Sequence, residues 1–204
     1  MVERGPLTSD AALWPLLAAG ALSLLIVAGV LLWRLYQRRR RNVDRRLREA
    51  CPGVLANFVI PDGNGEEIQV QYALLSGRGI LVIDIKDVEG HVFGSEAMQD
   101  WTVIADDRRF TFPNPQPGLW DRVAAVKRLT PEAPVTGFVA FAGRARFTKG
   151  QPKSVTLLEP LLQELEKEAA ASRSAVDGYL TAWERLRQAA IAARMDHLLS
   201  VRSR

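Results

Sequence analysis

The chain of 204 residues contains very little cysteine and histidine. Its single cysteine, Cys51, cannot form a disulfide within the chain, so the sequence does not require an oxidising compartment. The two histidines, His91 and His197, stand far from each other and from any cluster of ligands, which argues against a structural zinc site. Internal repeats and low-complexity tracts are absent as well, and the length leaves room for one membrane segment and a single domain.

Charged side chains are missing from residues 11–33, and this run exceeds the roughly 20 residues that a helix needs to cross about 30 Å of hydrocarbon. Trp14 and Trp33 lie near its two ends, where amphipathic rings favour the membrane interface. A cleaved signal peptide is the alternative, but the run is longer than a usual signal region and is followed by arginines. We therefore expect a transmembrane helix over residues 11–36, preceded by a short extracytoplasmic N-terminus over residues 1–10.

Positive charge is concentrated directly after this run, at Arg34 and residues 38–41, whereas Glu3, Arg4 and Asp10 precede it. Because positively charged flanks remain in the cytoplasm, the pattern predicts a single-pass protein of the inner (plasma) membrane with its N-terminus outside and its domain in the cytoplasm. The basic segment over residues 37–42 could also bind nucleic acid. A cluster beside a membrane helix more often contacts anionic headgroups, which we take as the better interpretation.

Hydrophobic periodicity predicts a domain of the α/β (α+β) class, with a mixed sheet flanked by helices. Alternating or apolar runs bounded by turn residues predict strands over residues 54–60, 67–75, 80–85, 91–93, 101–105, 110–112 and 135–142. Helical spacing predicts helices over residues 43–51, 119–129 and 157–168, and a last helix with Val176, Tyr179, Leu180, Trp183, Leu186 and Ala190 on one stripe. We expect the domain to cover residues 43–150, with a C-terminal helical segment over residues 151–204 that packs on the core.

One group of polar residues could carry chemistry. Asp84 and Lys86 stand two apart at the end of the apolar strand over residues 80–85, so both side chains project from the same face. If residues 76–79 form a four-residue turn, Gln71 lies opposite Asp84 on the neighbouring strand. Carboxylates on adjacent strands can hold Mg²⁺ while a lysine activates water, although an ordinary ion pair at a strand end explains the same residues.

The region over residues 43–147 resembles the nuclease-related domain family, NERD. The family's pattern runs as Q-I-D-H, then G-I-x-V-I-E-x-K, then spaced glycines and a tryptophan, followed by an N-P motif and a late strand. The matching positions in this chain are residues 69–72, residues 79–86, Gly90, Gly94, Trp101, residues 112–115 and residues 137–141.

This resemblance implies a restriction-endonuclease-like fold with a metal site in which Asp84 and Lys86 occupy the positions of the family's glutamate and lysine. Asp84 is then the candidate metal ligand and Mg²⁺ the cofactor of an active enzyme; an inactive domain needs none. Gln71 stands where the family has an aspartate, and no carboxylate is found at its upstream acidic position. Asp44 or Glu49 could supply a replacement ligand.

Because a neutral amide binds Mg²⁺ much less well than a carboxylate does, we expect a degenerate metal site. The preferred interpretation is a membrane-anchored binding or scaffold module at the inner membrane face, with nucleic acid or a protein as its partner. The alternative is an active Mg²⁺-dependent nuclease acting on DNA or RNA through Asp84 and Lys86.

Overall fold

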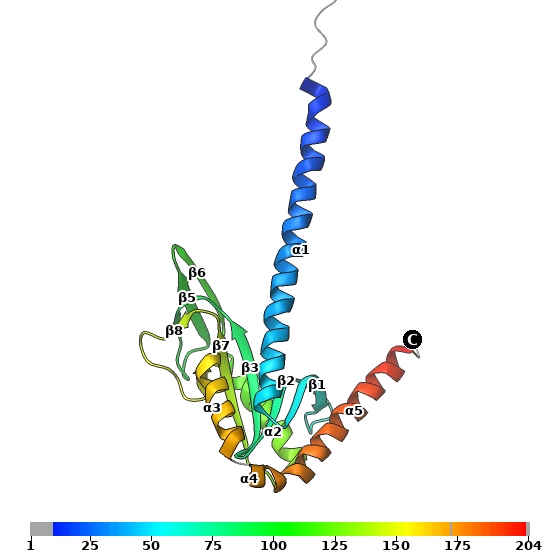
Figure 1. Cartoon of the computed structure of the whole chain (residues 1–204), viewed down its shortest axis with the longest axis vertical. Coiled ribbons are helices and arrows are strands. Elements are labelled where there is room, and N and C mark those ends of the chain that lie inside the picture. The colour runs from blue at the N-terminus through cyan, green and yellow to red at the C-terminus, as the bar shows by residue number, and fades with distance from the viewer. Residues whose placement is uncertain (1–9, 172, 203–204) are drawn as a thin grey trace, which may run out of the picture. The chain divides into compact units, whose positions relative to one another are not determined.

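The computed structural model describes residues 10–171 and 173–202, and its contacts divide the chain into two units, Met1–Arg45 and Arg46–Arg204. Helix α1 (Asp10–Ala50) forms the first unit as far as Arg45 and continues into the second (Figure 1). The separate helix predicted over residues 43–51 is therefore the end of α1. Arginine is a good helix former, and no proline or glycine interrupts the chain between Gly29 and Pro52, so the helix continues through the basic segment.

The predicted membrane anchor is not supported by the structure. Across the part of the chain that the structure describes, no helix is both long enough and apolar enough to cross a membrane. The expected span over residues 11–36 falls partly on residues 11–21, whose side chains lie outside this description, and the N-terminus over residues 1–9 lies outside it entirely.

The second unit contains a mixed five-stranded sheet in the order β1-β2-β3-β7-β9, with β3 at its centre. β1, β2 and β3 are antiparallel, whereas β7 and β9 run parallel to β3. The strands are β1 (Gly53–Pro61), β2 (Glu67–Ser76), β3 (Gly79–Asp87), β7 (Val135–Ala142) and β9 (Val155–Leu157). Residue 75 faces residue 80 across the β2–β3 turn, which confirms the predicted register.

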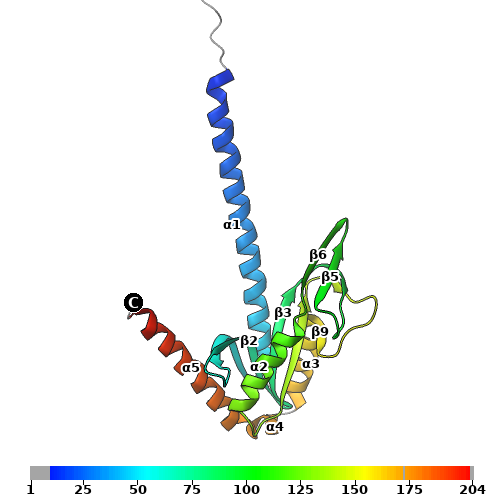
Figure 2. The ribbon, with the colours of Figure 1, turned by 180° about the vertical axis from the view of Figure 1, so that it is seen from behind.

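Helices cover both faces of this sheet, as predicted for the fold class. Helices α2 (Gln116–Leu129) and α5 (Leu180–Arg202) pack on one face, and α3 (Leu158–Ala171) packs on the other, followed by the short α4 (Arg173–Asp177) (Figures 1 and 2). Trp183 and Leu186 of α5 are buried in the core. The C-terminal helix therefore packs on the core as expected, although Leu180 of the predicted stripe is exposed.

A second, four-stranded sheet has the order β6-β5-β4-β8, whereas the sequence predicted a single sheet. Its strands are β4 (Gly90–Phe93), β5 (Asp100–Ala105), β6 (Arg108–Pro113) and β8 (Ala145–Arg146). The parallel strands β3 and β7 both bend and continue as the parallel pair β4 and β8. Gly90 (φ 118°) and Gly143 (φ 78°) lie at the two bends, in backbone conformations that favour glycine.

An aromatic cluster fills the space between the second sheet and the core. The fully buried Trp101 stacks on Phe141, with ring centroids 6.1 Å apart, and meets Phe112 edge-on at 6.2 Å. A Cβ at Gly94 would lie 2.2 Å from the Trp101 ring, so only glycine fits at this position. The glycine and tryptophan of the NERD-like pattern are thus a packing pair.

Candidate metal site

The β2–β3 hairpin brings Asp84 and Gln71 to the same end of the central sheet, as the register predicted. The antiparallel pairing ends at Tyr72 and Ile83, one residue short of the Gln71 and Asp84 positions. Beyond this point a side chain takes the place of backbone pairing between the strands. Gln71 Oε1 of β2 accepts a hydrogen bond from the Ile85 N–H of β3 at 2.5 Å. Gln71 therefore holds two strands together where their backbones no longer pair.

Asp84 is paired with a residue that the sequence analysis did not identify. Arg122 of α2 donates from Nη1 to Asp84 Oδ2 at 3.0 Å and from Nε to the Gln69 carbonyl oxygen at 2.7 Å. The Asp84 side chain is 7% exposed and that of Arg122 is 28% exposed. A single guanidinium thus neutralises the carboxylate of β3 and binds the backbone of β2.

Burial dominates the electrostatics of Asp84. Loss of solvent raises the pKa of this carboxyl above its ordinary value, although the positive charges of Arg122 and Lys86 act in the opposite direction. Its second oxygen, Oδ1, is buried and accepts no hydrogen bond from any described residue. Lys86 is half-buried on the same strand face, close enough to influence Asp84 electrostatically. The three predicted site residues are therefore neighbours, but they do not form a carboxylate cluster.

This donor set does not fit Mg²⁺. The ion takes six oxygen ligands in near-octahedral geometry and usually binds one or two carboxylates together with waters or substrate phosphates. Within the described residues, no three His, Cys, Asp or Glu side chains gather where they could hold a metal. Asp84 Oδ1 is the one unpartnered acceptor of the three predicted residues, because Arg122 takes Oδ2 and the Ile85 N–H binds the Gln71 oxygen.

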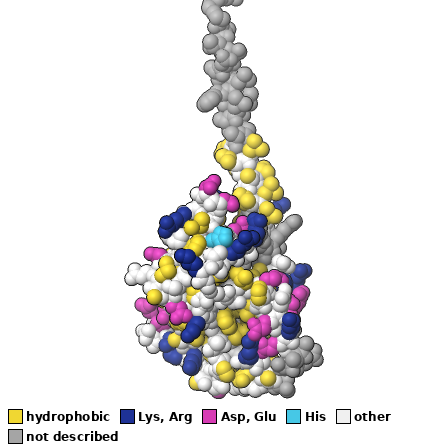
Figure 3. All heavy atoms as spheres, turned by 90° about the vertical axis from the view of Figure 1, so that its left-hand side faces the viewer, with side chains coloured by type: hydrophobic (Ala, Val, Ile, Leu, Met, Phe, Trp, Pro, Cys, Tyr) yellow, Lys and Arg dark blue, Asp and Glu magenta, His cyan; other side chains and the backbone are white. Residues whose placement is uncertain are grey.

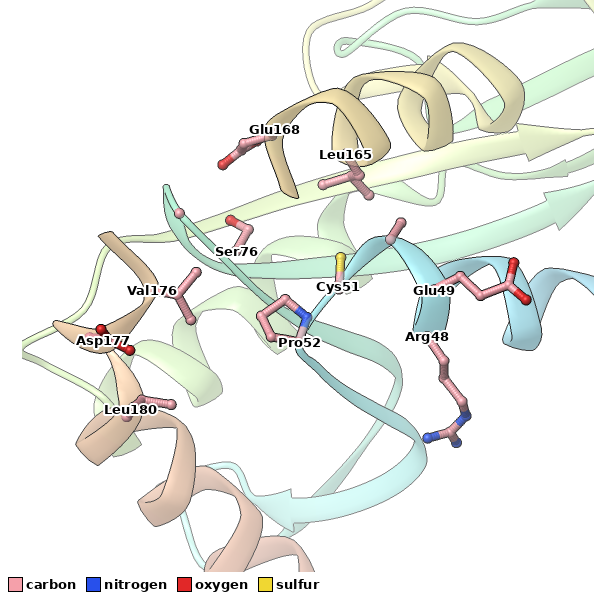
Figure 4. A pocket seen from close by; sticks show the side chains of 12 residues that line it. Arg48, Glu49, Cys51, Pro52, Ser76, Leu165, Glu168, Val176, Asp177 and Leu180 are labelled. Carbon is pink, nitrogen blue, oxygen red and sulfur yellow. The ribbon is translucent and has the colours of Figure 1, made fainter. Parts of the chain in front are cut away.

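Glu49, a candidate replacement ligand, lies beside a different hollow. Together with Cys51, Ser76 and Gly77, it lines a cavity of about 480 Å³ at the turn end of the β2–β3 hairpin (Figure 4). Asp84 is five residues along β3 from Gly79, which pairs with Ser76, a distance of roughly 16 Å at about 3.3 Å per residue. Glu49 therefore does not complete the Asp84 site.

The same cavity gives no sign of thiol chemistry. Burial, with a smaller contribution from the charge of Glu168, raises the pKa of Cys51 to about 12. Because the thiolate is the reactive form, Cys51 is an inert core residue at neutral pH.

The sequence does contain a signal for Arg122. Leu119, Val123 and Val126 define the apolar side of α2, and Arg122 is three residues after Leu119 and four before Val126. A cation on the core-facing stripe of a helix requires a buried anion or carbonyl partner. Asp84 is the buried acid of the neighbouring strand and is that partner.

The fold and the site define a mixed α+β domain whose central strand ends in an Asp-x-Lys pair. The chain belongs to the nuclease-related domain family, NERD, which matches residues 37–142, just over half of its length. It is also similar to an uncharacterized protein of Bacillus anthracis, with 26% identity over 76 residues. That similarity covers 37% of this chain and only 36% of the relative. No solved structure matches the chain.

Proposed function

We propose that this NERD domain has lost its metal site and acts as a binding or scaffold module for nucleic acid or a protein. The observation that carries the proposal is the pairing of Asp84 with Arg122. The half-buried guanidinium of Arg122 supplies the positive charge that a divalent cation would supply, and it is bound into the structure by a second hydrogen bond to the Gln69 carbonyl. Asp84 and Gln71 then serve as structural links between β2, β3 and α2.

The proposed fold type is restriction-endonuclease-like. The supporting features are the antiparallel β1–β2–β3 meander, the parallel β7 beside β3, and the position of the Asp-x-Lys pair at the end of the central strand.

The purified full-length chain is expected to show no metal-dependent cleavage of single-stranded or double-stranded DNA or RNA. The reason is that one carboxylate oxygen, beside an arginine, binds Mg²⁺ or Mn²⁺ too weakly to position a phosphate. Cleavage products are resolved on a gel after incubation with about 10 mM Mg²⁺ or Mn²⁺. This concentration is about tenfold above the Kd of a weak, millimolar metal site. Thermal stability with and without metal gives a second readout, expected to be unchanged.

Two substitutions make this assay decisive. Asp84→Ala and Lys86→Ala would remove a genuine activity, whereas Glu67→Ala, an exposed acid on β2, would not. Cleavage by the natural chain that both site variants lose would overturn the proposal and establish the nuclease.

An active Mg²⁺-dependent nuclease is the second candidate, favoured by the unpartnered Oδ1 of Asp84 and the neighbouring Lys86. It requires a further ligand from outside this pair, such as the substrate phosphate. The cleavage assay separates the two candidates directly.

We also propose that residues 11–36 attach the chain to the inner membrane, with the N-terminus outside and the domain in the cytoplasm. The support comes from the sequence: the charge-free run over residues 11–33 and the arginines over residues 38–41. Among the described side chains, large apolar residues between positions 22 and 35 are exposed to solvent, a surface that lipid would cover.

The membrane proposal predicts that the full-length chain stays in the membrane pellet after extraction at high pH, which removes peripheral proteins. Leu25→Arg together with Val27→Arg places two charges in the middle of the run, and each is expected to cost about 2.5–3.5 kcal/mol at the centre of a bilayer. This variant should move to the supernatant, whereas Leu25→Ala together with Val27→Ala should not. Release of the natural chain would contradict the proposal.

A further inference from the structure

The second sheet carries a row of basic and apolar side chains on one face. Its register places Arg109 (β6), Ile104 (β5), His91 (β4) and Arg146 (β8) side by side across the four strands. At a strand spacing of about 4.8 Å, this row is roughly 14 Å long. We call this surface the open face. It consists of Arg109, Ile104, His91, Arg146, Thr111, Thr102, Phe93 and Lys149.

The open face is exposed, whereas the opposite face of the same sheet is core. Val92 and Val103, which alternate with the open-face residues, are buried against the aromatic cluster. In the second row of the open face, Thr111, Thr102 and Phe93 are neighbours, and Lys149 Nζ lies 5.9 Å from the centroid of the Phe93 ring. These two rows contain no acidic residue. The nearest acid on the same face of β5 is Asp100, four residues from Ile104, a distance of about 13 Å.

The surface around this row is hollowed, and its arginines are available for binding. A hollow of about 1020 Å³ is lined by residues that include Arg108, Arg109, Phe110, Arg144 and Arg146. Figure 3 looks onto this side of the molecule and shows Lys and Arg side chains gathered around a histidine. Glu89, Asp87 and Asp106 also line the hollow, and Glu89 pairs with Arg144 at 3.2 Å.

Three of the arginines differ from Arg144, which pairs with Glu89, in their ion pairing. Arg108, Arg109 and Arg146 are exposed and form no ion pair with any residue that the structure describes. Ile104, 39% exposed, lies between Arg109 and His91 in the same row. Solvated cations next to exposed apolar side chains are available to a ligand that carries both negative charge and apolar surface.

We propose that the open face binds single-stranded nucleic acid. Cations set along a groove pair with successive phosphates, and exposed aromatic or apolar side chains contact bases that are not stacked in a duplex. Arg109, Arg146 and Lys149 supply the charges, and Phe93 and Ile104 supply the contacts to bases. The inference deepens the proposed function, on whose role as a binding module it rests, by naming the ligand class and the surface.

The shape of the surface favours this ligand over the other polyanions. A duplex keeps its bases stacked inside, so Phe93 and Ile104 would gain no base contact from it. A bilayer presents a flat layer of headgroups, whereas the arginines around Arg109 surround a hollow that a flexible strand can enter. The open face is also separate from Asp84, which faces α2 on the central sheet.

The test measures fluorescence anisotropy of labelled 12-nucleotide oligo(U) and oligo(dT) with the full-length chain in detergent, over a salt series. Arg109→Gln together with Arg146→Gln is expected to lower the affinity about tenfold or more. The same variant should reduce the slope of log K against log salt by about 1.4, or 0.7 for each lost phosphate contact in a single strand. The matched control, Arg187→Gln together with Arg194→Gln on α5, removes the same charge and should change the affinity less than about twofold.

Equal losses in the two double variants, tighter binding of a 12-base-pair duplex, or binding only to anionic vesicles would overturn the inference. Glu67→Ala, an exposed acid on β2, should bind as the natural chain does. Cleavage of the oligonucleotide would refute the inactive metal site and leave the open face standing, whereas the absence of both binding and cleavage would refute the open face alone.

Discussion

Replacing Arg122 by alanine is expected to lower the free energy of unfolding by about 2–4 kcal/mol at neutral pH. Removing one partner of a buried ion pair leaves the other charge uncompensated, which typically costs about 3–5 kcal/mol. The lower value applies here because the Arg122 side chain is 28% exposed and water can reach part of the pair. Urea unfolding of the full-length chain in detergent, followed by tryptophan fluorescence, to which the buried Trp101 and Trp183 contribute, measures the change.

The destabilisation should depend on pH with a definite sign. Burial already raises the pKa of Asp84, and loss of the guanidinium raises it further. A carboxyl with a raised pKa binds its proton more readily in the folded protein than in the unfolded chain. The folded state therefore gains stability as pH falls from neutral through this pKa towards the ordinary value of 3.8. The difference between Arg122→Ala and the natural chain should shrink over that range.

A double-mutant cycle separates charge from packing. In an Asp84→Asn background, Arg122→Ala removes no ion pair and should cost only about 1 kcal/mol for the lost bond to the Gln69 carbonyl. A coupling energy near zero would mean that Arg122 and Asp84 do not interact in solution, and the argument for a retired metal site would fail with it. Arg128→Ala, on the exposed side of the same helix, serves as the control.

The central hairpin could be predicted from sequence because its signals are local. The alternation in β2, the apolar run of β3 and the turn at residues 76–79 together fix which residues face each other. The placement of Gln71 opposite Asp84 can be predicted from that register alone. Their chemistry does not follow, because it depends on Arg122, which lies 38 residues beyond Asp84 in the chain and reaches it through the packing of α2.

The two-sheet arrangement is harder to predict for a different reason. Strands β4 and β8 continue β3 and β7. The sequence pattern predicted β4, β5 and β6 as strands, but not the two-residue β8. What divides the sheets is a change of direction at Gly90 and Gly143, and many glycines in the chain have no such role. A Cβ at Gly90 would lie 2.4 Å from the Ile104 carbonyl oxygen, a contact visible only in three dimensions.

A chain carrying Gln71→Asp together with Arg122→Gln is expected to gain a metal site that, on the proposed function, the natural chain has lost. The substitutions place a second carboxylate opposite Asp84, at the position that holds aspartate in the NERD pattern, and remove the competing guanidinium. Two carboxylates with water ligands suit Mn²⁺ or Mg²⁺, and we expect a Kd on the order of 1 mM. The decrease in free Mn²⁺ signal by electron paramagnetic resonance counts the bound ions directly.

Metal binding should also appear in stability, because a ligand that binds only the folded state stabilises it by RT ln(1 + [L]/Kd). At about 20 times Kd the gain is about 1.8 kcal/mol. Without metal the two carboxylates repel each other, so the variant should be less stable than Arg122→Gln alone and should recover as Mn²⁺ is added. Adding Asp84→Asn should abolish both effects. If the natural chain bound Mn²⁺ as well as the variant does, Arg122 would not be what excludes the metal, and the ligands of this site would have to lie elsewhere in the chain.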